Sequence, residues 1–357
     1  MDEKRNGSLY PASGQMGDVD EILNASFDVW EVSMKGTSRR FLTGTTIAFS
    51  VLAPLQSSAQ EVYPSRPIKI VVPFPPGAAA DALARLVGER LVAKLGQPVI
   101  VENKPGAAGN IGAELVAHAK PDGYTMLVSP PPPLVINQSL YPKLPFNPTL
   151  FVPITVIAAA PNLLVAHPSV RANNVGELIA EARAHPGKLN YASTGIGGTG
   201  HLATEWLKSV ADVNLAHVSY VGAKAYPAIL GGEVDVMFMT LSDALPHIRS
   251  GRIKGLGTGS EKRLPELPDV PSLGETIPGF VSTAWFGMVS APGTPPQVAE
   301  MISAVISDEL RQPEMAKKLK DMGVDPVGGS PTQTAAFFKD EALRWSKVIR
   351  EASIKVE

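Results

Sequence analysis

Short apolar runs alternate with amphipathic segments along the chain from Ile68 onward. The run over 68–74 predicts a strand. Leucine and valine then recur every three or four residues over 79–95, which predicts an amphipathic helix that ends at Gly96. This order of strands and helices is typical of a mostly parallel sheet. Further elements expected in this part are strands over 99–102 and 124–129 and a helix over 110–119.

The same alternation returns in the middle of the chain, after an apolar stretch over 154–166 that we expect to cross into a second lobe. A strong strand is expected over 283–290, after a segment rich in proline and glycine, and it leads the chain back. The elements expected between these crossings are helices over 175–184, 201–210 and 223–230 and strands over 189–192, 214–218 and 234–239.

Helices expected over 296–310 and 332–352 follow the returning strand, so we expect them to complete the first lobe. The predicted fold class is α/β, with two lobes that are each a mostly parallel sheet flanked by helices. Two chain crossings between lobes are typical of a hinge that opens and closes. The expected boundaries are 60–163 with 285–357 for the first lobe and 164–284 for the second.

The first sixty residues carry a targeting pattern instead of this alternation. A basic stretch over 34–40 precedes an apolar run over 41–55, and Ser57–Ala59 has the small-residue form of a cleavage site. We therefore expect a signal peptide over 34–59 that is cleaved near its end and directs the chain to the periplasm. The Arg39–Arg40 pair leaves both the Sec and the twin-arginine export routes open.

Composition excludes several classes of protein. A net charge of −2 over 357 residues gives no electrostatic footprint for nucleic acid or for an anionic membrane surface. The chain has no cysteine, which excludes disulfides, thiol nucleophiles and thiolate metal sites. The six histidines show no metal-binding spacing, and His201, at a helix start, is interpreted as a capping or core-edge group. We expect a binding protein without catalytic residues, metal or cofactor.

Two glycine-rich turns connect a strand to a helix, one in each expected lobe. The first spans 73–81 and the second spans 191–201. The start of a helix presents unpaired N–H groups, and small side chains let an anion approach them. Tight packing explains either turn alone, but two turns in two lobes predict a site for a carboxylate held between the lobes.

Ligands of open α/β sheets lie beyond the carboxyl ends of the strands, so we expect loops after other strands to join the two turns. The four prolines over 130–133 are expected to form a stiff polyproline II wall there. Asp81 is open to interpretation as a ligand-binding residue or as a helix cap. The residues expected to bind the ligand are Phe74, Pro76, Gly77, Ala78, Ala79 and Asp81 in the first turn, Ser193, Thr194, Gly195, Gly197 and Thr199 in the second, and Ser129, Pro130, Met239 and Thr240 in the loops.

A nucleotide-dependent enzyme is a less favoured alternative. The glycines over 106–112 superficially resemble a dinucleotide-binding fingerprint, but their spacing is wrong and Lys104–Pro105 breaks the tight turn that the motif requires. Glu102 precedes this cluster, whereas the acidic residue that takes a ribose follows the glycines.

Motifs spread over the chain from Tyr63 to its end resemble those of one protein family. They include the segments at 63–68, 72–77, 101–109, 121–125, 186–193, 200–203, 230–235, 268–272, 285–287, 291–295 and 338–345. On these residues the chain resembles the extracytoplasmic solute receptors of tripartite tricarboxylate transporters, the TctC or Bug family.

The resemblance implies a periplasmic-binding-protein fold of the Venus-flytrap type, with no catalysis and with delivery of a small carboxylate to membrane permease subunits. It also implies that turns at 75–81 and 193–199 hold the ligand carboxylate through backbone amides and bridging waters. A ligand-sensing receptor for a membrane signalling partner has the same fold and is an open alternative. We expect a monomer.

The chain departs from the family pattern at Ala78, where a second glycine is usual, and at Met239–Thr240, where an aspartate is frequent. Pro130–Pro133 replace a loop that is commonly small and polar. All three departures make the expected site more apolar. We therefore expect a carboxylate with an aromatic or aliphatic body, or a dicarboxylate, rather than an amino acid.

Residues 1–33 are polar, lack a periodic pattern and precede a signal sequence that begins with its own methionine, Met34. We expect translation to begin at Met34. Mass spectrometry of the precursor should therefore find no peptide from Asp2 to Ser33, and detection of such peptides would refute this start site.

Overall fold

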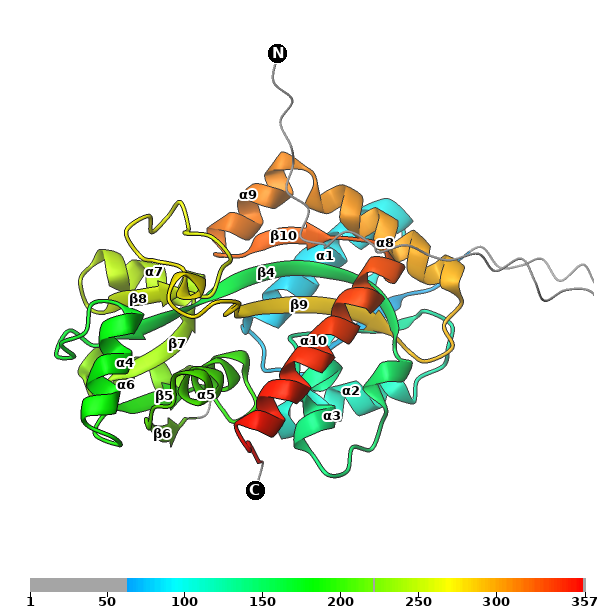
Figure 1. Cartoon of the computed structure of the whole chain (residues 1–357). Helices are drawn as coiled ribbons and strands as arrows, with labels where there is room; N and C mark the ends of the chain where they lie inside the picture. Colours follow the sequence, from blue (N-terminus) through cyan, green and yellow to red (C-terminus); the bar gives the residue numbers. More distant parts are fainter. Residues whose placement is uncertain (1–62, 221, 356–357) are drawn as a thin grey trace, which may run out of the picture. The chain divides into compact units, whose positions relative to one another are not determined.

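A computed structural model describes residues 63–220 and 222–355 of the chain (Figure 1). The expected signal peptide and N-terminal extension lie outside these residues. Within them the chain forms a ten-stranded mixed sheet flanked by helices. The strands are β1 (Ile68–Val72), β2 (Val99–Asn103), β3 (Thr125–Ser129), β4 (Val152–Ala166), β5 (Asn190–Ser193), β6 (Ala216–Ser219), β7 (Val236–Thr240), β8 (Lys254–Thr258), β9 (Thr283–Ser290) and β10 (Asp325–Gly328).

Helices cover both faces of the sheet. The α-helices are α1 (Ala79–Leu95), α2 (Asn110–Ala117), α3 (Asn137–Leu140), α4 (Val175–Ala184), α5 (Thr199–Ala211), α6 (Ala225–Gly231), α7 (Leu241–Arg249), α8 (Pro296–Leu310), α9 (Pro313–Asp321) and α10 (Pro331–Glu351). Short helical turns are η1 (Ala107–Gly109), η2 (Pro132–Ile136), η3 (Pro148–Leu150), η4 (Gly222–Lys224) and η5 (Leu273–Glu275). No helix in the described ranges is long and apolar enough to cross a membrane.

The sheet is parallel at its two ends and antiparallel in its middle. Its strand order is β2-β1-β3-β9-β4-β7-β5-β6, and β10 and β8 also pair with β4. The pairs β1–β2, β1–β3, β5–β6 and β5–β7 are parallel, whereas all pairs made by β4 and β9 are antiparallel. The mixed α/β sheet agrees with the predicted class, and its parallel pairs belong to the two series of alternating strands and helices.

The long strand β4 divides the sheet into two halves. Its first part pairs with β9 and β10, and its last part pairs with β7 and β8. We call β1, β2, β3, β9, β10 and the start of β4, with α1–α3 and α8–α10, the first half; β5–β8 and the end of β4, with α4–α7, are the second half. The first half therefore combines both ends of the described chain.

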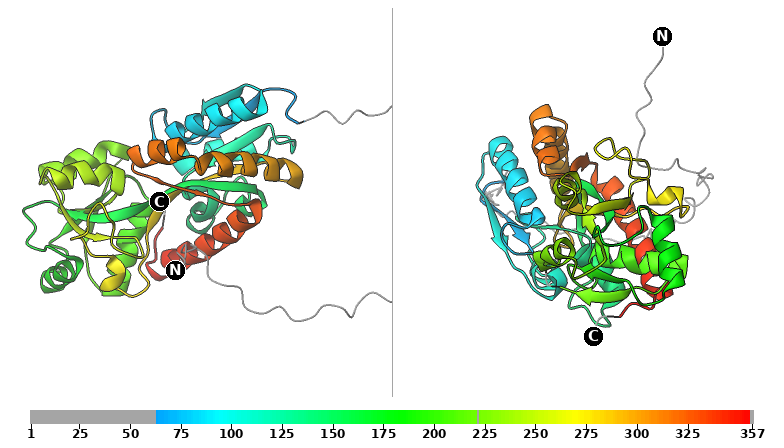
Figure 2. Two further views of the ribbon diagram at one scale, coloured as in Figure 1. Left: turned by 90° about the horizontal axis from the view of Figure 1, so that it is seen from above. Right: turned by 90° about the vertical axis from the view of Figure 1, so that its left-hand side faces the viewer.

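Each half has an apolar core on both faces of its sheet. In the first half, α1 and α8 lie side by side on one face and α10 lies on the opposite face (Figure 2). Helix α1 buries Leu83, Val87 and Leu91, which stand four residues apart on one side, and Gly96 ends it in the left-handed conformation at φ +70°. In the second half, α4 and α5 pack on one face and α6 and α7 on the other.

A buried hydrogen-bonded junction joins the halves at the point where the chain crosses. The side chain of Asn162 donates to Ser282 Oγ at 2.8 Å, and its backbone N–H donates to the Ser282 carbonyl at 3.0 Å. Gly259 N–H donates to the Asn162 carbonyl at 2.7 Å, and Ser282 N–H donates to the Gly259 carbonyl at 2.9 Å. Asn162 and Ser282 are at most 2% exposed, so these polar groups depend on one another for their partners.

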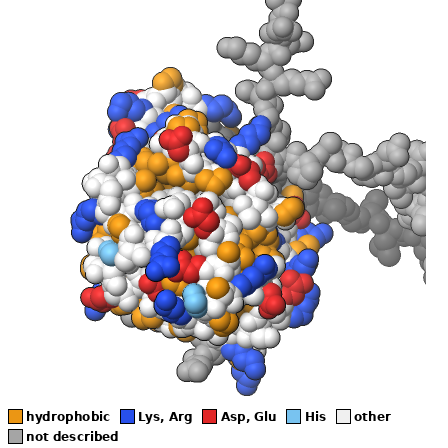
Figure 3. Space-filling model, turned by 60° about the vertical axis from the view of Figure 1, so that its left-hand side comes forward, with side chains coloured by type: hydrophobic (Ala, Val, Ile, Leu, Met, Phe, Trp, Pro, Cys, Tyr) orange, Lys and Arg blue, Asp and Glu red, His pale blue; other side chains and the backbone are white. Residues whose placement is uncertain are grey.

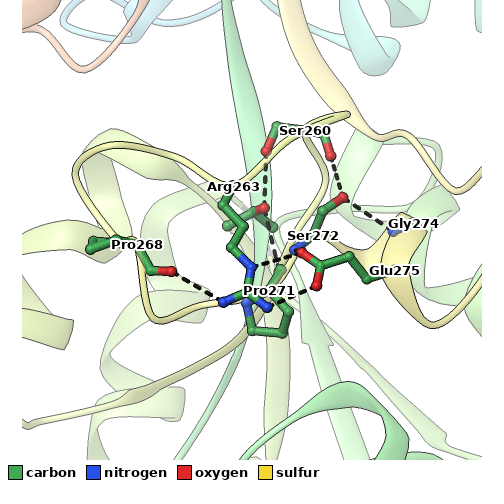
Figure 4. A network of polar contacts seen from close by, with 8 residues as sticks. Ser260, Arg263, Pro268, Pro271, Ser272, Gly274 and Glu275 are labelled. Carbon is green, nitrogen blue, oxygen red and sulfur yellow. Dashed lines mark hydrogen bonds and ion pairs between the residues drawn. The ribbon is translucent and has the colours of Figure 1, made fainter.

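The segment that leads from β8 back to β9 is fixed by its own polar contacts (Figure 4). Arg263 binds Glu275 through Nε at 2.9 Å and Nη2 at 2.8 Å, and the pKa of Glu275 falls to about 2 mainly because of these bonds. Ser272 caps η5 and donates its hydroxyl to the Ser260 carbonyl at 2.6 Å. These contacts give a long connection without regular structure a defined path to Ser282.

The last helix, α10, is anchored at the same crossing. Glu341, only 6% exposed, accepts the indole N–H of Trp285 at 2.7 Å and that of Trp345 at 3.2 Å, and it pairs with Arg344. Arg344 donates to the Val281 carbonyl at 3.1 Å. The C-terminal helix therefore holds the segment that enters β9.

Several predicted elements are confirmed with their boundaries. They are the helices over 79–95, 175–184 and 296–310 and the strand over 283–290. The other predicted elements are present with ends shifted by a few residues. Helices α3, α7 and α9 and strands β8 and β10 were not predicted, and the apolar stretch over 154–166, expected only to cross between lobes, lies in strand β4.

The expected polyproline II wall is wrong for Pro131–Pro133. Pro131 has helical angles (φ −52°, ψ −35°), and η2 begins directly after it, with Pro132 and Pro133 buried. Proline fixes φ near the helical value, and its missing N–H costs nothing in a first helical turn, where N–H groups have no intrahelical partner. The prolines therefore begin a helical turn.

We predict that position 259, in the buried junction, tolerates no side chain. A Cβ at Gly259 would lie 2.3 Å from the Ser282 carbonyl oxygen and 3.0 Å from that of Asn162. Gly259→Ala should therefore lower the free energy of unfolding by about 1–3 kcal/mol, measured by urea denaturation. Gly231→Ala is the matched control, because a Cβ at Gly231 meets nothing within 4 Å. Equal midpoints for the two variants would contradict the role of the junction.

Candidate functional site

The first predicted turn is an ordered strand-to-helix connection between β1 and α1. Gly77 has φ +81°, a conformation that favours glycine, and Ala78 precedes the helix with extended angles (φ −69°, ψ 159°). The N–H groups of Ala79 and Ala80 have no hydrogen-bond partner within the described ranges. Pro76, Gly77 and Ala79 are exposed, so this helix start is open to a ligand.

The side chain of Asp81 fixes the conformation of this turn through hydrogen bonds. Its Oδ2 accepts the Gly77 N–H at 3.0 Å and Arg85 Nε at 3.1 Å, and its Oδ1 accepts Asn103 Nδ2 at 3.0 Å. The same Asn103 group donates to the Phe74 carbonyl at 3.0 Å. Asp81 is 5% exposed, and the hydrogen bond from Arg85 is the main reason that its pKa is lowered. These contacts support the helix-cap interpretation, and ligand binding by the Asp81 carboxylate stays a prediction.

The second predicted turn, between β5 and α5, repeats the backbone of the first. Gly197 has φ +82°, and Gly198 precedes the helix with φ −67° and ψ 156°. The N–H groups of Thr199 and Gly200, like the Thr199 hydroxyl, have no hydrogen-bond partner in the described part of the chain. Gly195 adds a second unusual conformation, with φ +143°. Two helix starts with the same geometry therefore present free amides.

Polar side chains behind the second turn hold its glycines. Ser193 Oγ accepts the Gly195 N–H at 3.4 Å, and His201 Nδ1 accepts the Gly197 N–H at 3.4 Å. Both side chains are nearly buried, whereas Thr194 is exposed and its carbonyl accepts the Gly222 N–H at 2.9 Å. His201 therefore supports the turn, which fits its interpretation as a capping group.

The predicted loop residues contribute less accessible groups. Ser129 is fully buried and donates its hydroxyl to the Pro130 carbonyl at 2.9 Å, while Met239 is 2% exposed in the core of the second half. Thr240 caps α7, with its hydroxyl 2.7 Å from Asp243 Oδ2. A ligand-binding role for these residues stays a prediction.

Contacts connect the two turns through η2 and α3. Phe74 and Pro133 both lie against Gly109, where a Cβ would be 3.4 Å from Phe74 Cε2 and 3.0 Å from Pro133 Cγ. At the other end of this segment, Leu140 lies 2.7 Å from the position that a Gly197 Cβ would occupy. The second turn therefore packs against a residue of the first half.

Sequence reasoning missed four residues that shape the site: Asn103, Leu140, His217 and Asp243. Asn103 directly follows the strand predicted over 99–102, and Leu140 and His217 act through long-range contacts that leave no local pattern. Asp243 had a usable signal, since an acidic residue three positions after Thr240 is a common arrangement at a helix start.

A search of the described residues for metal clusters and cavities gives two results. No group of three or more His, Asp or Glu side chains in these ranges could hold a metal ion. A cavity of about 640 Å³ lies between α10 and the η2–α3 segment. Its lining contains Leu134, Phe338 and Lys339 but none of the residues predicted to bind the ligand.

Replacement of Asp81 by Asn should weaken the hydrogen bonds that fix the first turn. The nitrogen of the new amide is itself a donor, so it cannot accept an N–H that the carboxylate now binds. We therefore expect a loss of about 1–3 kcal/mol in the free energy of unfolding at pH 7. The lowered pKa means that ionised Asp81 stabilises the fold above about pH 4 and that this contribution is lost as the pH falls further.

Urea denaturation from pH 7 to pH 2.5 should show this pH dependence in the native chain and a weaker one in Asp81→Asn. Asp321→Asn is the control, because the side chain of Asp321 is 62% exposed and its ion-pair partner is Lys317. If both variants match the native chain, Asp81 does not organise the turn.

Two curated relatives cover most of the chain. It is 38% identical over 317 residues to the "UPF0065 protein in tcbD-tcbE intergenic region" of Pseudomonas sp. (strain P51), covering 88% of this chain and 94% of the relative. It is 34% identical over 313 residues to "Protein BugT" of Bordetella pertussis, covering 86% and 94%.

Solved structures show the same fold at similar identity. Rpa4515 of R. palustris with adipate has a TM-score of 0.75 and 33% identity, covering 82% of this chain and 99% of that chain. MatC (Rpa3494) of Rhodopseudomonas palustris with bound malate has a TM-score of 0.71 and 31% identity, covering 80% and 100%.

The sequence profile described as tripartite tricarboxylate transporter family receptor matches residues 83–354, which is most of the described chain. The match agrees with the relatives, with the fold and with the motifs. The chain therefore belongs to the receptor family of tripartite tricarboxylate transporters, the TctC or Bug family of periplasmic solute-binding proteins.

Proposed function

We propose that the protein is exported to the periplasm, binds a small carboxylate between its two halves and delivers it to the membrane permease subunits of a tripartite transporter. The halves are then the two lobes, with the boundaries expected from the sequence, and the chain performs no catalysis. We further propose that the ligand is a dicarboxylate or a monocarboxylate with an apolar body.

The observation that carries this proposal is the pair of matched helix starts. Ala79 and Ala80 in the first half, and Thr199 and Gly200 in the second, have N–H groups without a partner in the described residues. Each helix start also carries a partial positive charge from the aligned peptide dipoles. Four amides without a formal positive charge suit a carboxylate that must later be released to a permease.

The ligands of related structures support the choice of an acid. The structure of Rpa4515 is with adipate and that of MatC is with bound malate, and both of these ligands are dicarboxylates. Both proteins are more than 30% identical to this chain over almost their whole length. We therefore extend dicarboxylate binding to this protein as a proposal.

Side chains at the turns favour an apolar ligand body. Ile196 in the second turn is 39% exposed, and Phe74 in the first turn is half-buried. Asp243 is an acidic group near Thr240, but it already accepts hydroxyl hydrogen bonds from Thr240 and Tyr226, each at 2.7 Å. An ammonium group of an amino acid would compete with these bonds, whereas an aliphatic or aromatic body would not.

The surface of the second half carries charges of both signs. On the face drawn in Figure 3, basic and acidic side chains are intermixed with apolar ones. A face of this kind offers no single-sign field for nucleic acid, and it suits contacts with a protein partner such as a permease.

Isothermal titration calorimetry on protein stripped of bound ligand tests the proposal. We expect adipate, malate or benzoate-like acids to bind with measurable heat, and aspartate and citrate to bind at least about tenfold more weakly, because a misplaced charge costs more than about 1.4 kcal/mol. Tight binding of aspartate or citrate with no binding of the other acids would refute the ligand class.

A further inference from the structure

In both turns a side chain accepts a glycine N–H, but the two accepting groups differ in their chemistry. In each, the N–H of the left-handed glycine is bound by a side chain four residues later. This side chain is Asp81 Oδ2 in the first turn and His201 Nδ1 in the second. Both acceptors are 5% exposed. An ionised carboxylate always accepts a hydrogen bond, whereas an imidazole nitrogen accepts one only while it is unprotonated.

The surroundings of His201 favour the unprotonated ring. Burial lowers its pKa to about 4, and His217, whose ring centroid lies 4.6 Å away on β6, acts in the same direction. Lys208, on the same helix as His201, also lowers this pKa, and Glu205 raises it. Tyr191 on β5 contributes a neutral ring, because burial raises the pKa of its hydroxyl, which donates to Glu205.

A second imidazole supports the neighbouring glycine. Ser193 Oγ lies 2.7 Å from His217 Nε2 and accepts the Gly195 N–H. In this geometry the Ser193 hydroxyl can donate its proton to an unprotonated Nε2. His217 also stacks on Tyr191 with ring centroids 4.6 Å apart, and burial lowers its pKa. The Gly197 N–H is therefore bound by an imidazole, and the Gly195 N–H by a hydroxyl that contacts one.

We propose that His201 and His217 are positioning residues that orient the second turn for its ligand, and that their protonation makes ligand binding weaken in acid through this turn. Protonation would change each acceptor into a donor that faces an N–H or O–H group, so Gly195 and Gly197 would lose their fixed orientation. The turn is fully formed at neutral pH and is lost as the pH falls toward 4. This inference rests on the proposed function for the link to ligand binding.

Two substitutions at His201 separate acceptor chemistry from packing. His201→Asn keeps a neutral side-chain oxygen that can accept the Gly197 N–H, as Asp81 does in the first turn, and it has no titrating group in this range. His201→Leu fills similar volume without an acceptor. His118→Gln, at an exposed position directly after α2, is the control for a generic loss of histidine.

Calorimetry with adipate at pH 7.5 and at pH 3.5, which lies below the pKa of about 4 for His201, gives the first readout. At pH 7.5, His201→Asn should bind like the native protein, and His201→Leu should bind about tenfold more weakly, the effect of one lost orienting hydrogen bond. Between the two pH values the native protein and His118→Gln should lose more affinity than His201→Asn. Protonation of adipate itself is common to all variants and cancels in this comparison.

The ring nitrogens give a readout that needs no ligand. In ¹⁵N NMR spectra of the native protein at pH 6, His201 should have an unprotonated Nδ1 and His217 an unprotonated Nε2. A protonated Nδ1 on His201 at this pH, or equal pH dependence of binding in the native protein and His201→Asn, would overturn the inference. If neither adipate nor malate binds any variant, the proposed function fails in its ligand class, and the ring protonation still decides the state of the turn.

Discussion

The continuity of β4 is the constraint on which the rest of the structure depends. A single strand belongs to both halves, and it changes partners from β9 and β10 to β7 and β8 within a few residues. Pro161, which has no N–H for a sheet bond, lies directly before Asn162 at this change. The buried bonds among Asn162, Gly259 and Ser282 then satisfy the backbone where regular pairing is interrupted. The sheet remains one piece, each half has its own core clusters, and Leu202 of α5 joins the cluster that α10 covers in the first half.

The candidate site follows from this arrangement. The parallel strands β1 and β5 lie in opposite halves, and each feeds a helix through a glycine turn of the same conformation. Side chains of neighbouring strands and helices, not the turns themselves, decide which amides are available: Asp81 and His201 take the glycine N–H groups and leave those of the next helical residues free. Specificity in such a site depends on what surrounds the rest of the ligand, because backbone amides distinguish an anion from a neutral group but not one acid from another.

Local patterns predicted the fold where an element carried its own signals. Helix α1 has regular apolar spacing and a terminal glycine, α8 begins at Pro296 directly after Pro295, and β9 is an apolar run between Thr283 and Ser290. Their ends could therefore be read from the chain. Helix α7 contains Pro246, and β8 contains two glycines, both of which weaken the local signal. Both form because their apolar residues complete the core of the second half.

The candidate site was likewise predictable only where a local sequence pattern marks it. The two turns could be found from glycine, small residues and the strand before them, and these are the features that the structure displays. The partners of the turns could not, because Asn103 and His217 reach them from other strands. The Pro130–Pro133 segment was misjudged because prolines are compatible with both an extended wall and a first helical turn, and burial of Pro132 and Pro133 against the core decides between them.

The position of the crossings also sets an order for folding. All strands and helices of the second half come from one continuous stretch, so its core can form as soon as that stretch has been synthesised. In the first half, β3 needs β9 as its second neighbour, and the buried Glu341 that holds Trp285 belongs to the last helix. The half that forms from the first strands is therefore completed last, and it remains incomplete until α10 has been synthesised.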